Sequence, residues 1–158
     1  MKKFVIIATV MLLGAGVALA ASINVPFFLD DTPPGGGFPP QTDTMFFIGL
    51  KNTTAAPIVL TVDYRKSDGT VSTISVGNAT FSLGAFESIS FRPHFLDDGV
   101  DSQNAGAAFI NPGRSDDTAG AATFTWAGGT NDIQGRGVQI GGVTENVGSF
   151  SFLLPPGV

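Results

Sequence analysis

Apolar and polar residues alternate with a period of two along much of the chain, which is the spacing of β-strands with one buried face. In residues 58–64 (IVLTVDY) every even-numbered position is apolar or aromatic, which predicts a strand with one face in a core and the other in water. Residues 45–50 (MFFIGL) are apolar at nearly every position and predict a central strand that is covered on both faces. Shorter runs predict further strands at 22–29, 71–76, 81–83, 89–91, 122–126, 137–140 and 149–154.

Turn-forming residues separate these runs. Asp68-Gly69 predicts a tight hairpin turn with 71–76 as its return strand, because both residues tolerate a positive φ. Pro26 restricts the first run to a sheet edge or a strand end. Residues 30–40, rich in Pro and Gly, and the stretch 92–117 carry loop signals. About seven to nine short strands and no helical period predict an all-β chain, folded as a single antiparallel β-sandwich of Ig-like or jelly-roll-like type.

The first twenty residues predict a cleaved secretory signal that is not part of the fold, with an uncleaved membrane anchor as the alternative. Lys2 and Lys3 supply a positive start, an apolar run follows, and Ala18-Leu19-Ala20 matches a small-x-small cleavage site. A signal of this bacterial kind places the mature protein in the periplasm, on the cell surface or outside the cell, with no transmembrane span of its own. The expected division is a signal peptide (1–20), an N-terminal edge strand with its Pro- and Gly-rich loop (21–44) and a β-sandwich domain (45–158).

Charge and cysteine content narrow the range of partners and chemistry. The 8 basic residues fall to 6 once Lys2 and Lys3 leave with the signal, against 13 acidic residues, so the mature net charge is −7. Because no Lys and Arg cluster is present to contact phosphates, we expect no nucleic-acid partner. The chain contains no cysteine, which excludes disulfides, thiol nucleophiles and thiolate metal sites.

One segment carries a resemblance to a known class of domain. The apolar strand 46–52 (FFIGLKN), the alternating strand 58–64, the Asp68-Gly69 turn and the short runs between 81 and 91 follow one another at sandwich spacing. This segment, under half of the expected mature chain, resembles the Ig-like and fibronectin-type-III-like domains of bacterial surface proteins. The resemblance implies a β-sandwich architecture, without the Cys and Trp signature of true immunoglobulin domains.

An acidic loop offers a candidate metal site. Asp97, Asp98 and Asp101 supply the hard oxygen ligands that Ca²⁺ prefers. Asp30 and Asp31, which end a similar Phe-Leu-Asp-Asp sequence earlier in the chain, could join them from another loop. The spacing excludes an EF-hand, and the alternative interpretation is a solvated acidic turn. Ca²⁺ is the one cofactor that the sequence suggests.

The remaining side chains that could take part in catalysis or binding are interpreted as structural. His94 is the single histidine, so a multi-histidine zinc site within one chain is excluded, and any Ser-His-Asp set would depend on this residue alone. We assign no catalytic residue. Trp126 and Tyr64 are suited to a sugar platform but lie in phase with apolar neighbours, which predicts packing in the core. Asn52 and Asn78 each begin an N-glycosylation acceptor pattern that we interpret as turn sequence.

Two apolar strands near the ends of the mature chain are candidates for assembly. Low charge and a high strand content allow one subunit to add a strand to the sheet of a neighbour. The candidate residues are Ile23 and Val25 in the first strand, and Phe150 and Phe152 in the last. In the alternative interpretation, each segment is the ordinary first or last strand of its own domain.

These patterns together predict an exported, non-enzymatic β-sandwich that serves as a structural or adhesive component of the bacterial cell surface or extracellular matrix. Its expected partners are further copies of itself, joined by strand addition, or another surface protein. One alternative is a small secreted binding module for a glycan, Ca²⁺ or a protein, with loops such as 92–104 as its binding surface. A further alternative is an uncharacterised all-β hydrolase.

Overall fold

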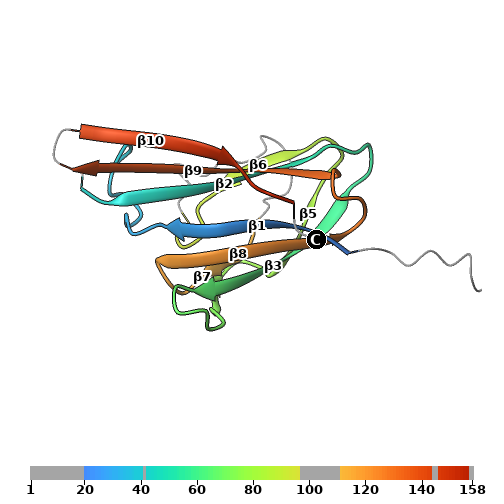
Figure 1. Ribbon diagram of the computed structural model, residues 1–158, viewed down its shortest axis with the longest axis horizontal. Coiled ribbons are helices and arrows are strands. Elements are labelled where there is room, and N and C mark those ends of the chain that lie inside the picture. The colour runs from blue at the N-terminus through green and yellow to red at the C-terminus, as the bar shows by residue number, and fades with distance from the viewer. Residues whose placement is uncertain (1–19, 41, 97–110, 144–145, 157–158) are drawn as a thin grey trace, which may run out of the picture.

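Two four-stranded antiparallel sheets stack on each other in the computed structural model of the chain (Figure 1). The structure describes residues 20–40, 42–96, 111–143 and 146–156. Throughout these ranges the regular elements are all strands, which confirms the predicted all-β, antiparallel sandwich. They are β1 (Ala20–Leu29), β2 (Thr44–Asn52), β3 (Ile58–Lys66), β4 (Ile74–Val76), β5 (Thr80–Leu83), β6 (Ser88–Phe91), β7 (Arg114–Ser115), β8 (Ala119–Ala127), β9 (Ile133–Val143) and β10 (Asn146–Leu153).

The strand order joins distant parts of the sequence. The first sheet has the order β1-β8-β3-β5, the second has the order β10-β9-β2-β6, and β4 pairs with β7 in a small third sheet. The interior strands β2, β3 and β8 have nine residues each and β9 has eleven, whereas the edge strands β5 and β6 have four each. Within the described part of the chain, no helix is long and apolar enough to cross a bilayer.

Side chains between the two sheets form one hydrophobic core. β3 alternates as predicted, with Leu60 fully buried and Val59 exposed. The rings of Phe81, Phe91 and Phe124 meet edge to face with centroids 6.0 to 6.4 Å apart, a favourable arrangement for aromatic pairs. Because Phe81 and Phe124 belong to the first sheet and Phe91 to the second, this cluster links the two layers.

β2 is buried on both faces over its first half, as its unbroken apolar run predicts. Phe46 and Ile48 point into the core between the sheets. Met45 and Phe47 alternate with them and so lie on the outer face, yet both are buried. The ring of Phe38, from the Pro- and Gly-rich loop, packs edge-on against Phe47 with centroids 6.3 Å apart. This loop therefore covers part of the outer face of the second sheet.

The turn at Asp68-Gly69 forms as predicted, but the predicted return strand does not pair as a hairpin. Gly69 has a φ of +85°, the left-handed conformation expected at this position. After a single bridge to β3 the chain departs from it, and β4 pairs with β7 instead. The hydroxyl of Ser72 is buried and makes 2.6 Å hydrogen bonds with Ser115 and Asp116, which hold the chain beside β7.

Asn52, the last residue of β2, fastens the turn that follows it. Its amide nitrogen donates to the carbonyl oxygens of Ala56 at 2.7 Å and Gly84 at 2.8 Å, and its Oδ1 accepts from the N–H of Thr54 at 2.8 Å. The side chain is fully buried, so it leaves no room for a glycan. The interpretation of this acceptor pattern as turn sequence is confirmed.

Replacing this asparagine tests the turn directly. Asn52→Ala is expected to lower the free energy of unfolding by about 2–4 kcal/mol, because it leaves buried backbone groups without partners. Urea unfolding of the two proteins measures the difference. The matched control is Asn78→Ala, a change at the exposed asparagine of the other acceptor pattern, with an expected effect within about 0.5 kcal/mol. Equal losses in both variants would contradict this role of Asn52.

Candidate functional site: the free edge of the second sheet

Four strands form the edges of the two main sheets, and they differ in how much backbone they expose. β5 and β6 are short. β1 contains Pro26 and an irregular register between Val25 and Phe28, two features that discourage further pairing. β10 has eight residues in regular register with β9. Among the described residues, β9 is the only strand that pairs with β10. β10 is therefore the longest regular edge in the described structure.

Hydrogen bonding fixes which residues of β10 point to the free side. The N–H of Leu154 donates to the carbonyl oxygen of Gly135, in β9, at 2.9 Å. Successive residues of an antiparallel strand direct their backbone groups to opposite sides. The odd-numbered residues of β10 therefore direct theirs away from β9: Val147, Ser149, Ser151 and Leu153. Pro155 continues this series, and its carbonyl oxygen accepts from the N–H of Asn24 in β1.

The side chains of this edge are apolar and well exposed. Phe150 is 57% exposed and Leu153 is 82% exposed. Phe152 lies on the same face as Phe150, stacks with it at a centroid distance of 6.1 Å, and packs against the core. Figure 1 shows the β9–β10 end of the second sheet projecting beyond the ends of β1 and β8. From residue 146 onward the sequence carries no charged side chain.

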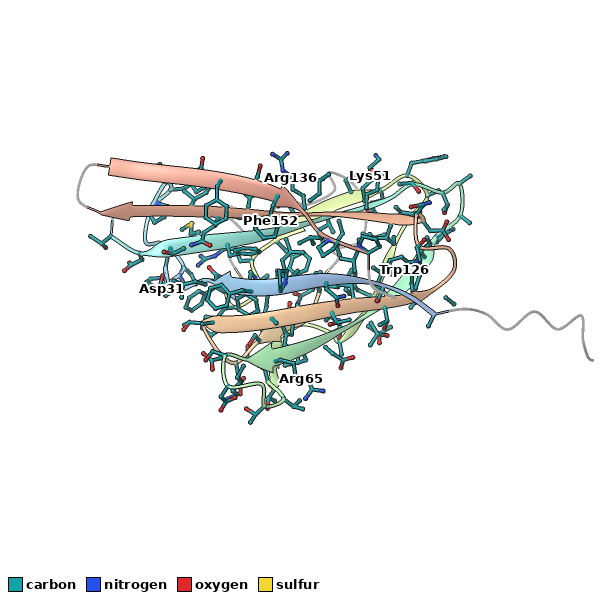
Figure 2. The ribbon with its side chains drawn as sticks, in the orientation of Figure 1. Asp31, Lys51, Arg65, Trp126, Arg136 and Phe152 are labelled. Atoms are coloured by element: carbon teal, nitrogen blue, oxygen red, sulfur yellow. The ribbon has the colours of Figure 1, made fainter. Side chains whose placement is uncertain are left out.

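The outer face of the second sheet, next to β10, carries both charged and apolar side chains. Lys51 and Arg136 border a shallow hollow that Gly49 and Leu153 also line. Arg136 donates a hydrogen bond to the hydroxyl of Ser151 on β10. Figure 2 shows Lys51 and Arg136 projecting from this layer away from the first sheet, and Phe152 between the layers. The edge thus has one aromatic face and one face on which the apolar Leu153 lies beside polar side chains.

The other two predicted assembly residues are built into the first sheet. Ile23 and Val25 are buried in the core, and β1 pairs with β8 over most of its length. On the other side of β1, Ile23 forms a bridge with Pro156. β1 is thus a strand of the chain's own sheet. Of the two predicted segments, the last one keeps a free side within the described residues.

The predicted calcium ligands Asp97, Asp98 and Asp101 lie outside the described residues and stay a prediction. The two carboxylates suggested as additional ligands are engaged in the fold. Asp30 is buried against Arg92, and Asp31 accepts a 2.7 Å hydrogen bond from the first N–H of β2. Within the described ranges, no three His, Asp or Glu side chains are placed to hold a metal ion.

Asp30 and Arg92 form a completely buried ion pair. Both Nε and Nη2 of Arg92 donate to Oδ1 of Asp30, the first at 2.9 Å, and Oδ2 accepts from the N–H of His94 at 3.1 Å. Asp30 follows β1 and Arg92 follows β6, so the pair joins the two sheets. Burial raises the pKa of the Asp30 carboxyl above its usual value, while Arg92 and the backbone N–H groups oppose that rise.

Further buried polar groups surround this pair. The guanidinium of Arg114 lies over the ring of Phe91, 4.9 Å from its centroid, and its Nε donates to the carbonyl oxygen of Phe95 at 3.1 Å. The hydroxyl of Tyr64 donates to the carbonyl oxygen of Gly113 at 2.9 Å, and burial raises the pKa of this phenol. These contacts are all made within the chain, and they fix the loop ends at this end of the sandwich.

The other side chains that the sequence analysis singled out are also engaged inside the fold. Trp126 is buried between the layers and donates to the carbonyl oxygen of Gly129 at 3.1 Å (Figure 2). The prediction that Trp126 and Tyr64 pack in the core is confirmed. The Nδ1 atom of His94 lies 2.9 Å from the carbonyl oxygen of Ser115, to which it donates a hydrogen bond, because a carbonyl oxygen can only accept. The chain's single Trp and single Tyr are thus not available as a sugar platform.

Fold and edge together define a two-layer antiparallel β-protein in which, within the described ranges, the long strand β10 pairs on one side only. No protein family matches the sequence, and no curated protein matches it. Among solved structures, the crystal structure of Thermotoga maritima 1070, from Thermotoga maritima, matches with a TM-score of 0.51 and 7% sequence identity. The match covers 85% of this chain and 91% of that one. At this identity the likeness concerns the fold alone.

Proposed function

We propose that this protein is an exported, non-enzymatic structural or adhesive component of the bacterial cell surface or extracellular matrix, whose subunits associate through β10. The observation that carries the proposal is one strand that combines outward backbone groups, exposed apolar side chains and no charge. Such an edge is a template for pairing with another chain. β1 has a proline and a bulge that discourage pairing, whereas β10 has neither.

The N-terminal sequence and the engaged polar groups support the rest of the proposal. Residues 1–20 have the composition of a secretory signal. The buried polar cluster around Asp30 and Arg92 bonds to the chain itself, so it serves to hold the loops of the sandwich in place. Association through an edge strand is the function that the described surface favours.

Solution mass tests the proposal. The chain is expressed with its own N-terminal segment in a bacterial host and recovered from the periplasm or medium, and mass spectrometry identifies its first residue, expected to be Ala21. Light scattering after size exclusion, with and without Ca²⁺, is expected to give a dimer or larger assembly, and electron microscopy of the same material shows whether filaments form. A strict monomer at all concentrations in both conditions would contradict association.

A further inference from the structure

We propose that β10 pairs antiparallel with β10 of a second copy of this chain, about a two-fold axis that passes beside Phe150. This inference rests on the proposed function, association through β10, and adds the partner strand and its register. It follows from the order of backbone groups along the strand, the space beside Gly148 and the absence of charge.

A second copy of β10 matches this edge better than the other edges described. β5 and β6 are half its length. β1 is irregular at Pro26, and its outer side is already occupied near Ile23 by the bridge to Pro156. Identical strands that pair antiparallel form a closed two-fold contact, the arrangement most common among homo-oligomers.

The outward backbone groups determine the register. They belong to residues 147, 149, 151 and 153, a set centred on residue 150. A pairing that uses all four on both copies places residue 147 opposite 153 and residue 149 opposite 151. A shift by two residues in either direction leaves one outward residue of each copy without a partner. The register centred on Phe150 therefore forms the most hydrogen bonds.

The same register matches the side chains. Phe150 lies opposite Phe150 of the second copy in a non-hydrogen-bonded pair, where Cα atoms approach to about 4.5 Å and side chains are closest. Phe152 lies opposite Gly148 of the second copy. A Cβ built on Gly148 has nothing within 4 Å, so there is open space for a ring. The stacked Phe150 and Phe152 of each copy would thus form a continuous aromatic row and lose their exposure to water.

The lack of charge agrees with a two-fold contact. About such an axis, each residue near the centre lies close to its own counterpart, so any charged side chain would meet the same charge, which is destabilising. The sequence from residue 146 onward has no charged side chain, although the net charge of the chain is −5. A strand that paired with a charged partner would instead be expected to carry the complementary charge.

Disulfide cross-linking tests the register, because the chain has no cysteine of its own. Three single variants are made: Phe150→Cys, Ser149→Cys and Ser151→Cys. Under mild oxidation, most of the Phe150→Cys protein is expected to form a covalent dimer. Ser149→Cys and Ser151→Cys are expected to cross-link poorly alone but efficiently when mixed, since only the mixed pair lies within the Cα separation of about 4.4–6.8 Å that a disulfide needs. Val59→Cys, at an exposed residue of the interior strand β3, is the control and should remain uncrosslinked.

The outcomes separate the inference from the proposed function. The mass of each reduced variant is measured first. If the protein associates but Ser149→Cys or Ser151→Cys cross-links as well alone as in the mixture, the two-fold register is wrong and association stands. If the unmodified protein is a monomer, both the two-fold register and the proposed association through β10 are wrong. The mixed experiment keeps Phe150 intact, so it remains decisive if Phe150→Cys itself weakens association.

Discussion

Arg92→Met is expected to reduce the free energy of unfolding by about 3–5 kcal/mol at neutral pH, the cost typical of removing one partner from a buried ion pair. The substitution leaves the carboxylate of Asp30 in the interior without its guanidinium, although the N–H of His94 still donates to it. It also removes the two side-chain hydrogen bonds by which Arg92, after β6, holds Asp30, after β1. Urea unfolding of both proteins, followed by circular dichroism, measures the loss.

Lys66→Met is the matched control. Lys66 forms an ion pair with Asp116 at 3.5 Å, but about a third of each side chain is exposed. Exposed pairs contribute only about 0–1 kcal/mol, so this variant should lose at most that amount. If both variants lost the same small amount, the buried pair would not stabilise the connection between the sheets.

The decrease in the free energy of unfolding caused by Arg92→Met should also depend on pH. Without Arg92 the pKa of Asp30 in the folded state rises further above the value of about 3.9 that it has in the unfolded chain. When the folded-state pKa is the higher one, the folded state holds more protons, and stability is lost as the pH rises through that window. The cost of the substitution should therefore be smallest below about pH 4 and should grow toward neutral pH. A cost that stays constant with pH would rule out the buried carboxylate as its cause.

Phe150→Lys is expected to convert the associated protein to a monomer without unfolding it. At the centre of the proposed interface each copy would lose an aromatic anchor, a loss of about 2 kcal/mol or more. Two-fold symmetry doubles this loss and places the new ammonium groups opposite each other, so the dissociation constant should rise by roughly 1,000-fold. Because Phe150 is 57% exposed, the free energy of unfolding of the subunit should change by less than about 1 kcal/mol.

Sedimentation velocity across a dilution series measures that change in association. Val59→Lys is the control, because Val59 is 59% exposed but lies on β3, whose two sides are paired with β5 and β8. That variant should associate as the unmodified chain does. Association that survives Phe150→Lys but is lost in Val59→Lys would place the interface on the first sheet instead of at the free edge.

The sequence predicts strands where alternation or an unbroken apolar run controls burial. β3 follows its pattern residue by residue, and β2 is covered on both faces as its composition predicts. Alternation does not determine which strands are neighbours. The pairing of β4 with β7 depends on the hydroxyl of Ser72 and on partners about forty residues away, and a two-residue strand such as β7 has no periodicity to detect.

The candidate site was predictable only in part, because the sequence pattern indicates strands but not their neighbours. The apolar composition of residues 149–154 marks them as a candidate for assembly, but the free side of β10 depends on strand order. The buried ion pair was missed, because Asp30 and Arg92 are 62 residues apart and both adjoin loop sequence. One signal was present, the repeated Phe-Leu-Asp-Asp sequence: Asp30 of the first copy accepts a hydrogen bond from His94, the residue before the second copy.

The bridge between Ile23 and Pro156 joins the two ends of the described chain. It brings the first described strand and the last described residues together at one end of the sandwich, while Asp30, which follows β1, lies seven residues further along the chain. At about 3.3 Å per residue, that separation is roughly 20 Å. In an antiparallel pair of subunits, the two Ile23–Pro156 bridges would lie at opposite ends of the joined strands. The two bridges would therefore be separated by the full length of the paired strands.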